Sequence, residues 1–194
     1  MLKHHDALSV ARLLRPTQPV TLVRPDAARR AARFFLAKFP GTSMYAVKAN
    51  PSPDLIRTLW DAGLTHYDVA SIAEVRLVRE VAPNATLCFM HPIKAPEAIA
   101  EAYHVHGVRV FSLDSIEELD KIVAATATDG VPATDLTLCV RLRVSSSHSK
   151  LSLASKFGVH ADEAAPVLMA ARQVADALGI CFHVGSQAMS PQAY

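Results

Sequence analysis

From Thr42 onward, short runs of β-branched and apolar residues alternate with longer stretches of helical periodicity, and this alternation constrains the fold most. Such a pattern is typical of βαβ units built around a parallel sheet. The intervening stretches carry apolar residues at helical spacing, as at Leu55, Leu59 and Ala62. The predicted strands are residues 43–49, 66–71, 86–92, 108–114, 136–144 and 180–186. The sequence therefore predicts an α/β fold with six parallel strands.

Three glycines stand where helices should end. Gly63, Gly107 and Gly179 each come shortly before a predicted strand. A helix that stops in a left-handed cap favours glycine, which has no Cβ to clash. We expect all three to be caps of this kind.

The N-terminal part lies outside the alternation. The segment PVTLVRP, residues 19–25, reads as a short strand between prolines, and residues 26–39 read as an amphipathic helix. We expect residues 1–25 to be an N-terminal segment whose strand belongs to a second, β-rich domain. Residues 26–194 would then form a separate α/β domain.

Two architectures fit six parallel strands. A closed eight-stranded α/β barrel typically needs about 250 residues, so 194 residues with six strands predict an incomplete barrel. On this interpretation the chain is a fragment that is inactive or unstable alone, and its exposed strand edge and apolar face promote aggregation. The alternative is an open doubly wound sheet, which requires a reversal of strand order.

Composition excludes several partners. The 20 basic and 18 acidic residues are intermixed and give a net charge of +2, so no nucleic-acid partner is indicated. No apolar run has the length of a signal peptide or reaches the roughly 18 residues of a membrane span, and we expect a cytoplasmic protein. Cys88, Cys139 and Cys181 read as reduced core residues. The sequence contains neither an HExxH nor a GxGxxG motif, so it predicts no metal site and no nucleotide site.

Polar residues gather at the carboxyl ends of the predicted strands, where parallel α/β folds bind ligands. Taken singly, a serine or aspartate there is usually a helix cap, and a histidine is usually a hydrogen-bonded core residue. Lys48 is more discriminating, because a lysine desolvated in an apolar strand can present the neutral amine that attacks carbonyl groups. The residues are Lys48, Asp68, Ser71, His91, Lys94, Asp114, the segment 141–145, His183 and Ser186.

Six ordered motifs make the sequence similar to a known family. They are YAVKAN (45–50), YDVASIAEV (67–75), HPIK (91–94), FSLDS (111–115), VRLRV (140–144) followed by SKFG (155–158), and HVGSQ (183–187). Together they resemble the fold-type III pyridoxal-phosphate-dependent decarboxylases, the ornithine, diaminopimelate and arginine decarboxylase family. The ASIAE segment at 70–74 resembles the ornithine decarboxylase branch, and FMHPIK (89–94) with FSLDS resembles the bacterial enzymes of that branch.

The resemblance implies a (β/α)8 barrel of the type that forms the N-terminal domain of alanine racemase and ornithine decarboxylase. It implies that Lys48 holds pyridoxal 5′-phosphate covalently and takes part in catalysis. His183, also catalytic, would lie flat against the cofactor ring, and Ser186 would bind the phosphate.

Three further cofactor-binding assignments follow from the same resemblance. Asp68 and Glu74 would belong to the polar network around the lysine. Arg141 would lie near the ring hydroxyl or its supporting carboxylates. Strand alternation puts Arg143 on the same face as Arg141, so Arg143 stays an alternative.

The implied reaction is decarboxylation of L-ornithine to putrescine, in polyamine biosynthesis, by a protein whose complete form is a homodimer. Lysine, arginine and meso-diaminopimelate are alternative substrates. Non-catalytic alternatives are a regulator of the antizyme-inhibitor type and a cofactor carrier resembling small single-domain barrels. The family's glycine-rich phosphate loop, the acidic partner of the pyridine nitrogen, and the residues that reach the partner subunit's site are not found in this sequence.

Overall fold

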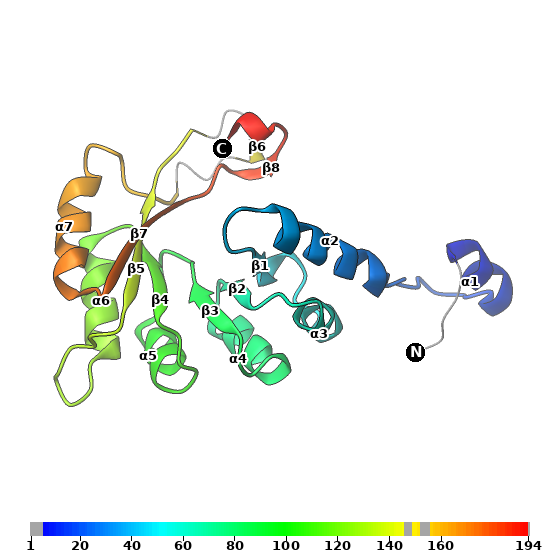
Figure 1. The fold of residues 1–194 in the computed structure, drawn as a ribbon, viewed down its shortest axis with the longest axis horizontal. Coiled ribbons are helices and arrows are strands. Elements are labelled where there is room, and N and C mark those ends of the chain that lie inside the picture. Colours follow the sequence, from blue (N-terminus) through cyan, green and yellow to red (C-terminus); the bar gives the residue numbers. More distant parts are fainter. Residues whose placement is uncertain (1–5, 146–148, 152–155, 194) are drawn as a thin grey trace.

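The computed structural model describes residues 6–145, 149–151 and 156–193, and the predicted alternation forms a parallel sheet covered by helices (Figure 1). The six strands of this sheet are β1 (Met44–Ala46), β2 (His66–Val69), β3 (Thr86–Phe89), β4 (Val110–Leu113), β5 (Thr137–Leu142) and β7 (Ala177–Phe182). The α-helices are α1 (Ala7–Leu14), α2 (Pro25–Lys38), α3 (Pro53–Asp61), α4 (Ile72–Val81), α5 (Pro96–His104), α6 (Ile116–Thr126) and α7 (Ala164–Val174). Short elements complete the described chain: the 3₁₀ turns η1 (Val47–Ala49) and η2 (Pro191–Ala193), and the strands β6 (Ser149–Leu151) and β8 (Ser186–Ala188).

Strand order decides between the two expected architectures. The sheet runs β1-β2-β3-β4-β5-β7, and every neighbouring pair is parallel. This order never reverses, so the topological switch point of a doubly wound sheet is absent from these six strands. Helices α3 to α7 lie along the outside of the curved sheet (Figure 1). The arrangement is that of a partial α/β barrel.

The two faces of the sheet differ in chemistry. On the outer face, alternate strand residues such as Tyr67, Phe111 and Leu138 are fully buried in a core shared with the helices. On the inner face, the alternation places Asp68, Ser112 and other small or polar side chains. The apolar core therefore holds the helices outside the sheet and leaves polar groups along the inside.

Local signals set most of the helix ends. The Ser71 and Ser115 hydroxyls cap α4 and α6 by accepting from the backbone amides of Glu74 and Glu118. The left-handed caps expected at two glycines are confirmed, with φ of +101° at Gly63 and +67° at Gly107.

The prediction for Gly179 was wrong. This residue lies inside β7, which begins at Ala177 rather than residue 180. Gly179 pairs with Cys139 of β5, and a Cβ at Gly179 would lie 3.2 Å from the Cys139 Sγ. The glycine therefore allows a close approach between neighbouring strands instead of ending a helix.

This structure has no strand at residues 19–25, and the assignment of the segment to a second, β-rich domain stays a prediction. Residues 19–24 are irregular, Pro25 starts α2, and the side chains of Val20, Leu22 and Val23 are about half exposed. A strand needs a neighbour for its backbone amides and carbonyls, and no described segment pairs with this one. The helix predicted over 26–39 is confirmed as α2.

Large apolar side chains remain exposed at the end of the sheet. Ile180 and Phe182 on β7 are 58% and 48% exposed. None of the described helices is both long enough and apolar enough to cross a membrane.

Candidate active site

Lys48 lies directly after β1, in the 3₁₀ turn η1, because the strand is shorter than residues 43–49. Val47 beside it is completely buried, whereas Lys48 is exposed. The expected desolvation of the amine is therefore wrong for this structure. The buried valine fixes the turn, and the lysine side chain extends from the carboxyl end of the strand.

Asp68 lies on the inner face of β2, next to β1. Burial raises the pKa of its carboxyl group, while the positive charges of Lys48 and Arg141 act in the opposite direction. Glu74, in the first turn of α4, accepts a 2.8 Å hydrogen bond from the backbone amide of Ala70 and adds negative charge near Asp68. Two carboxylates and two cations thus interact across β1, β2 and β5.

His183 follows β7 and is half-buried. Burial, followed by the charges of Lys48 and Arg141, lowers the pKa of the imidazole. The backbone amide of Gly185 donates to His183 Nδ1 over 3.0 Å. Because Nδ1 accepts this bond, the neutral ring carries its proton on Nε2.

Ser186 is the first residue of β8, which pairs antiparallel with β6. Neither short strand was predicted, since three residues are too few for a recognisable pattern. Gly185 before it has φ of +99°, and a Cβ there would lie 2.1 Å from the Ser149 Oγ. Glycine is therefore required at residue 185, where the chain passes close to Ser149 of β6. Ser186 follows directly and lies at the same rim as His183.

The structure separates the two candidate arginines. The Arg141 guanidinium lies over the Phe157 ring, 5.2 Å from its centroid, and its charge acts on Asp68 and His183. The Arg143 guanidinium instead contacts His160 Nε2 at 2.8 Å. Arg141 is thus the arginine that joins the other candidate residues, and its cofactor role stays a prediction.

Other residues of the predicted rim have structural contacts. Lys94 is fully buried, and its Nζ donates to the carbonyls of His91 and Ser112 and pairs with Glu118 at 2.8 Å. All three ammonium hydrogens are engaged, so Lys94 has no free amine to offer. Asp114 accepts from the backbone amide of Gly158 over 2.8 Å, and Ser71 caps a helix.

The three cysteines lie on the inner face of the sheet and form no disulfide. Cys88 is buried as expected, while Cys139 and Cys181 are only partly buried. Burial raises the pKa of Cys88 to about 12 and that of Cys139 to about 11. These thiols are therefore protonated at neutral pH and are poor nucleophiles.

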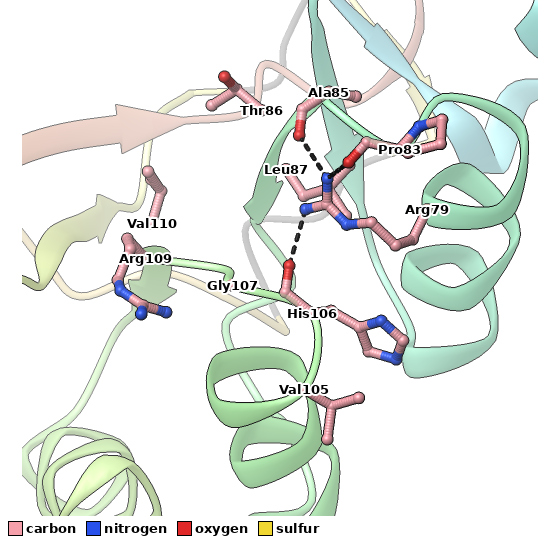
Figure 2. Close-up of a pocket in the computed structure, with 10 residues that line it drawn as sticks. All are labelled: Arg79, Pro83, Ala85, Thr86, Leu87, Val105, His106, Gly107, Arg109 and Val110. Carbon is pink, nitrogen blue, oxygen red and sulfur yellow. Dashed lines mark hydrogen bonds between the residues drawn. The ribbon is translucent and has the colours of Figure 1, made fainter.

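A pocket of about 530 Å³ lies at the opposite, amino end of β3 and β4 (Figure 2). Arg79 forms one wall, and its guanidinium donates to the carbonyls of Pro83, Ala85 and His106. These bonds tie two helix-to-strand joints together. None of the predicted site residues lines this pocket, and residues at this end of barrel strands usually serve stability.

The donor set at the carboxyl rim fits pyridoxal 5′-phosphate. The cofactor carries an aldehyde, a flat ring and an anionic phosphate. The rim offers the exposed amine of Lys48, the imidazole of His183, the hydroxyl of Ser186 and the positive charge of Arg141. Among the described residues, no group of three or more histidine, cysteine or acidic side chains is placed to hold a metal ion.

Sequence reasoning included Phe157 only within the SKFG motif, and it missed the contacts of this residue and the part that Asp114 plays in holding the loop beside it. Phe157 contacts Arg141 by its ring face and forms a T-shaped contact with the His91 ring. The available signal was the glycine that follows it, since Gly158 has φ of +92° and lies against the β5 backbone.

Curated relatives include two kinds of protein. The chain is 36% identical over 152 residues to the lysine/ornithine decarboxylase of Selenomonas ruminantium, covering 77% of this chain and 36% of that protein. It is 33% identical over 152 residues to human antizyme inhibitor 2, covering 77% and 31%. The chain thus spans about a third of the length of these relatives.

A solved structure and a family model agree with this fold. The crystal structure of an SrLDC mutant in complex with PLP matches with a TM-score of 0.83 at 30% identity, covering 100% of this chain and 48% of that one. Residues 26–194 match the model for the pyridoxal-binding domain of pyridoxal-dependent decarboxylases. The chain therefore belongs to the pyridoxal-dependent decarboxylase family.

Proposed function

We propose that this chain forms the cofactor-binding part of a decarboxylase of basic amino acids, with L-ornithine as substrate and putrescine as product. The observation that carries the proposal is the interaction of Lys48, Asp68, Arg141 and His183 at the carboxyl ends of β1, β2, β5 and β7. An amine, a carboxylate, a guanidinium and an imidazole from four strands meet at the end where such folds bind ligands.

The chain's own residues prepare this site. Lys48 is exposed, so its amine can reach a carbonyl carbon without displacing core side chains. His183 is kept neutral by burial and by two nearby cations, and Gly185 fixes the orientation of its ring. A neutral ring held this way can stack on a flat ligand without adding a buried charge.

Charge balance is the second contribution. Asp68 interacts with the positive charges of Lys48 and Arg141, and Glu74 adds a second carboxylate. When bound, pyridoxal phosphate supplies the conjugated ring that takes up the electron pair released as CO₂ leaves.

The choice of substrate rests on the relatives and on the ASIAE segment. A lysine/ornithine decarboxylase is among the proteins that this chain resembles, so lysine is the nearest alternative. Arginine and meso-diaminopimelate are the other two alternative substrates. Rates of CO₂ release from these four substrates, measured with the full-length polypeptide, test the choice, and a clear preference for another substrate refutes ornithine. The proposed full-length form is a homodimer.

A second candidate is a regulator without catalysis. The observation that favours it is the 33% identity to human antizyme inhibitor 2. A regulator has no need of a reactive lysine beside a cation-flanked histidine. Cofactor attachment at Lys48 together with substrate-dependent CO₂ release would exclude this candidate, and the absence of both would favour it.

In the first experiment, this chain is incubated with pyridoxal phosphate and reduced with borohydride. Peptide mapping then shows which lysine carries the pyridoxyl group. We expect the pyridoxyl group on Lys48 and its loss in Lys48→Ala. Lys38→Ala, which removes an exposed lysine at the end of α2, is the matched control and should leave the labelling unchanged. Labelling spread evenly over exposed lysines would contradict the proposed site.

A further inference from the structure

Phe157 links Arg141 to the loop that follows β3. The Arg141 guanidinium carbon is 5.2 Å from the centroid of the Phe157 ring. The same ring forms a T-shaped contact with His91, with centroids 5.4 Å apart and planes at 77°. A guanidinium over an aromatic face is attracted by the ring quadrupole, and an edge-to-face neighbour fixes the tilt of that ring.

The backbone around Phe157 is held firmly on one side. The Gly158 amide donates to Asp114 Oδ2 over 2.8 Å. The Val159 amide donates to the Arg141 carbonyl of β5, and the amide of Arg143, directly after β5, donates to the Val159 carbonyl, each over 2.9 Å. The residue after Phe157 is thus anchored to β4 by a carboxylate, and the next one is anchored to β5 by the main chain.

A buried ion pair holds the other side. The Lys94 ammonium donates to the His91 carbonyl over 3.0 Å and pairs with Glu118 of α6. The Lys94 side chain is 0% exposed and that of Glu118 is 3% exposed, so this ion pair is shielded from water. His91 therefore presents its ring to Phe157 from a fixed backbone position.

Arg143 provides an internal comparison. It lies two residues after Arg141, on the same face by alternation, yet its guanidinium contacts His160. Of these two arginines, Arg141 is the one with an aromatic ring beneath it. The two guanidinium groups therefore have different partners, an aromatic ring for Arg141 and an imidazole for Arg143.

We propose that Phe157 is a positioning residue, whose ring holds the Arg141 guanidinium beside Asp68 and His183. The functional part of this inference rests on the proposed function, because Arg141 matters to catalysis only if the rim binds the cofactor. The position of the Arg141 guanidinium does not depend on the proposed function, and it can be tested before any cofactor is added.

The test uses the full-length polypeptide without cofactor and follows the titration of His183 by NMR, with the signal assigned from its loss in His183→Asn. Lys48 and Arg141 are the charges that lower the pKa of this imidazole. Phe157→Met keeps apolar bulk but removes the ring, and we expect it to raise the His183 pKa as Arg141 moves away. Phe157→Tyr keeps the ring and should preserve the original value.

A double-mutant cycle separates positioning from a general loosening of the fold. In an Arg141→Met background, Phe157→Met should produce no further change in the His183 pKa. The matched control Phe34→Met replaces a ring that is 60% exposed on α2 and should have no effect in either background. Circular dichroism checks that each variant is folded.

The outcomes are distinct. A His183 pKa that is unchanged by Phe157→Met, or that changes equally with and without Arg141, overturns the positioning role. If the cycle succeeds, we expect Phe157→Met to weaken pyridoxal phosphate binding by about three- to tenfold, the range for a partly desolvated cation–π contact. A coupled pKa change without labelling at Lys48 would support the geometry and refute the proposed function.

Discussion

Replacement of Lys94 by methionine should destabilise the chain strongly, although Lys94 is one of several lysines near the rim. Its Nζ lies 3.0 Å from the His91 carbonyl oxygen, 2.6 Å from that of Ser112 and 2.8 Å from Glu118 Oε1. Neither side chain of the ion pair has more than 3% of its surface exposed. Water therefore cannot replace the lost ammonium without a rearrangement of the loop.

The size of the effect follows from what Lys94→Met leaves behind. The buried Ser112 carbonyl and the partly buried His91 carbonyl lose a donor, and an unsatisfied buried group costs about 1–3 kcal/mol. Glu118 keeps Lys121, whose Nζ is 2.5 Å from Oε2, and this contact limits the penalty on the carboxylate. Breaking a buried pair by removing one partner typically costs about 3–5 kcal/mol, and we expect a loss in that range.

Urea unfolding followed by circular dichroism measures this loss. The double variant Lys94→Met/Glu118→Leu removes both charges, so its loss should fall well below the sum of the two single losses. Arg76→Met breaks an exposed pair with Glu101 and should hardly move the urea midpoint. Additive single losses, or a loss below about 1 kcal/mol for Lys94→Met, would refute the reasoning.

Three other predictions concern the backbone, the thiols and the buried acid. Gly158→Ala should cost about 2 kcal/mol or more in urea unfolding, because φ is +92° and the new Cβ would lie 2.7 Å from the Arg143 backbone nitrogen. With a pKa of about 12, Cys88 should react with iodoacetamide at pH 8 roughly a thousand times more slowly in the folded chain than in urea, as mass spectrometry can measure; equal rates would contradict its burial. Burial raises the folded-state pKa of Asp68, so its contribution to stability is complete below the unfolded pKa and is lost as pH rises through the folded one. Asp68→Asn should therefore increase thermal stability at neutral pH while it weakens cofactor binding, and a lower melting temperature there would contradict this.

The sequence by itself determined the order of elements and the candidate residues. Strands and helices alternate at a period that few folds share, so the α/β class followed from apolar spacing alone. Because parallel strands end at one rim, the polar residues after the strands were predictable as a group. The family motifs then suggested which of these residues bind a cofactor.

The tertiary structure decided what each polar residue contacts, because burial and partners depend on distant parts of the chain. Lys48 and Lys94 both looked like candidates at strand ends, but Lys48 is exposed in a turn, whereas Lys94 is buried against a carbonyl of β4 and a carboxylate of α6. Arg141 lies in β5 and Arg143 directly follows it, yet Arg141 lies over the Phe157 ring whereas Arg143 contacts His160. Local patterns fix periodicity and turns, whereas contacts across the sheet arise from packing between segments that the sequence alone does not bring together.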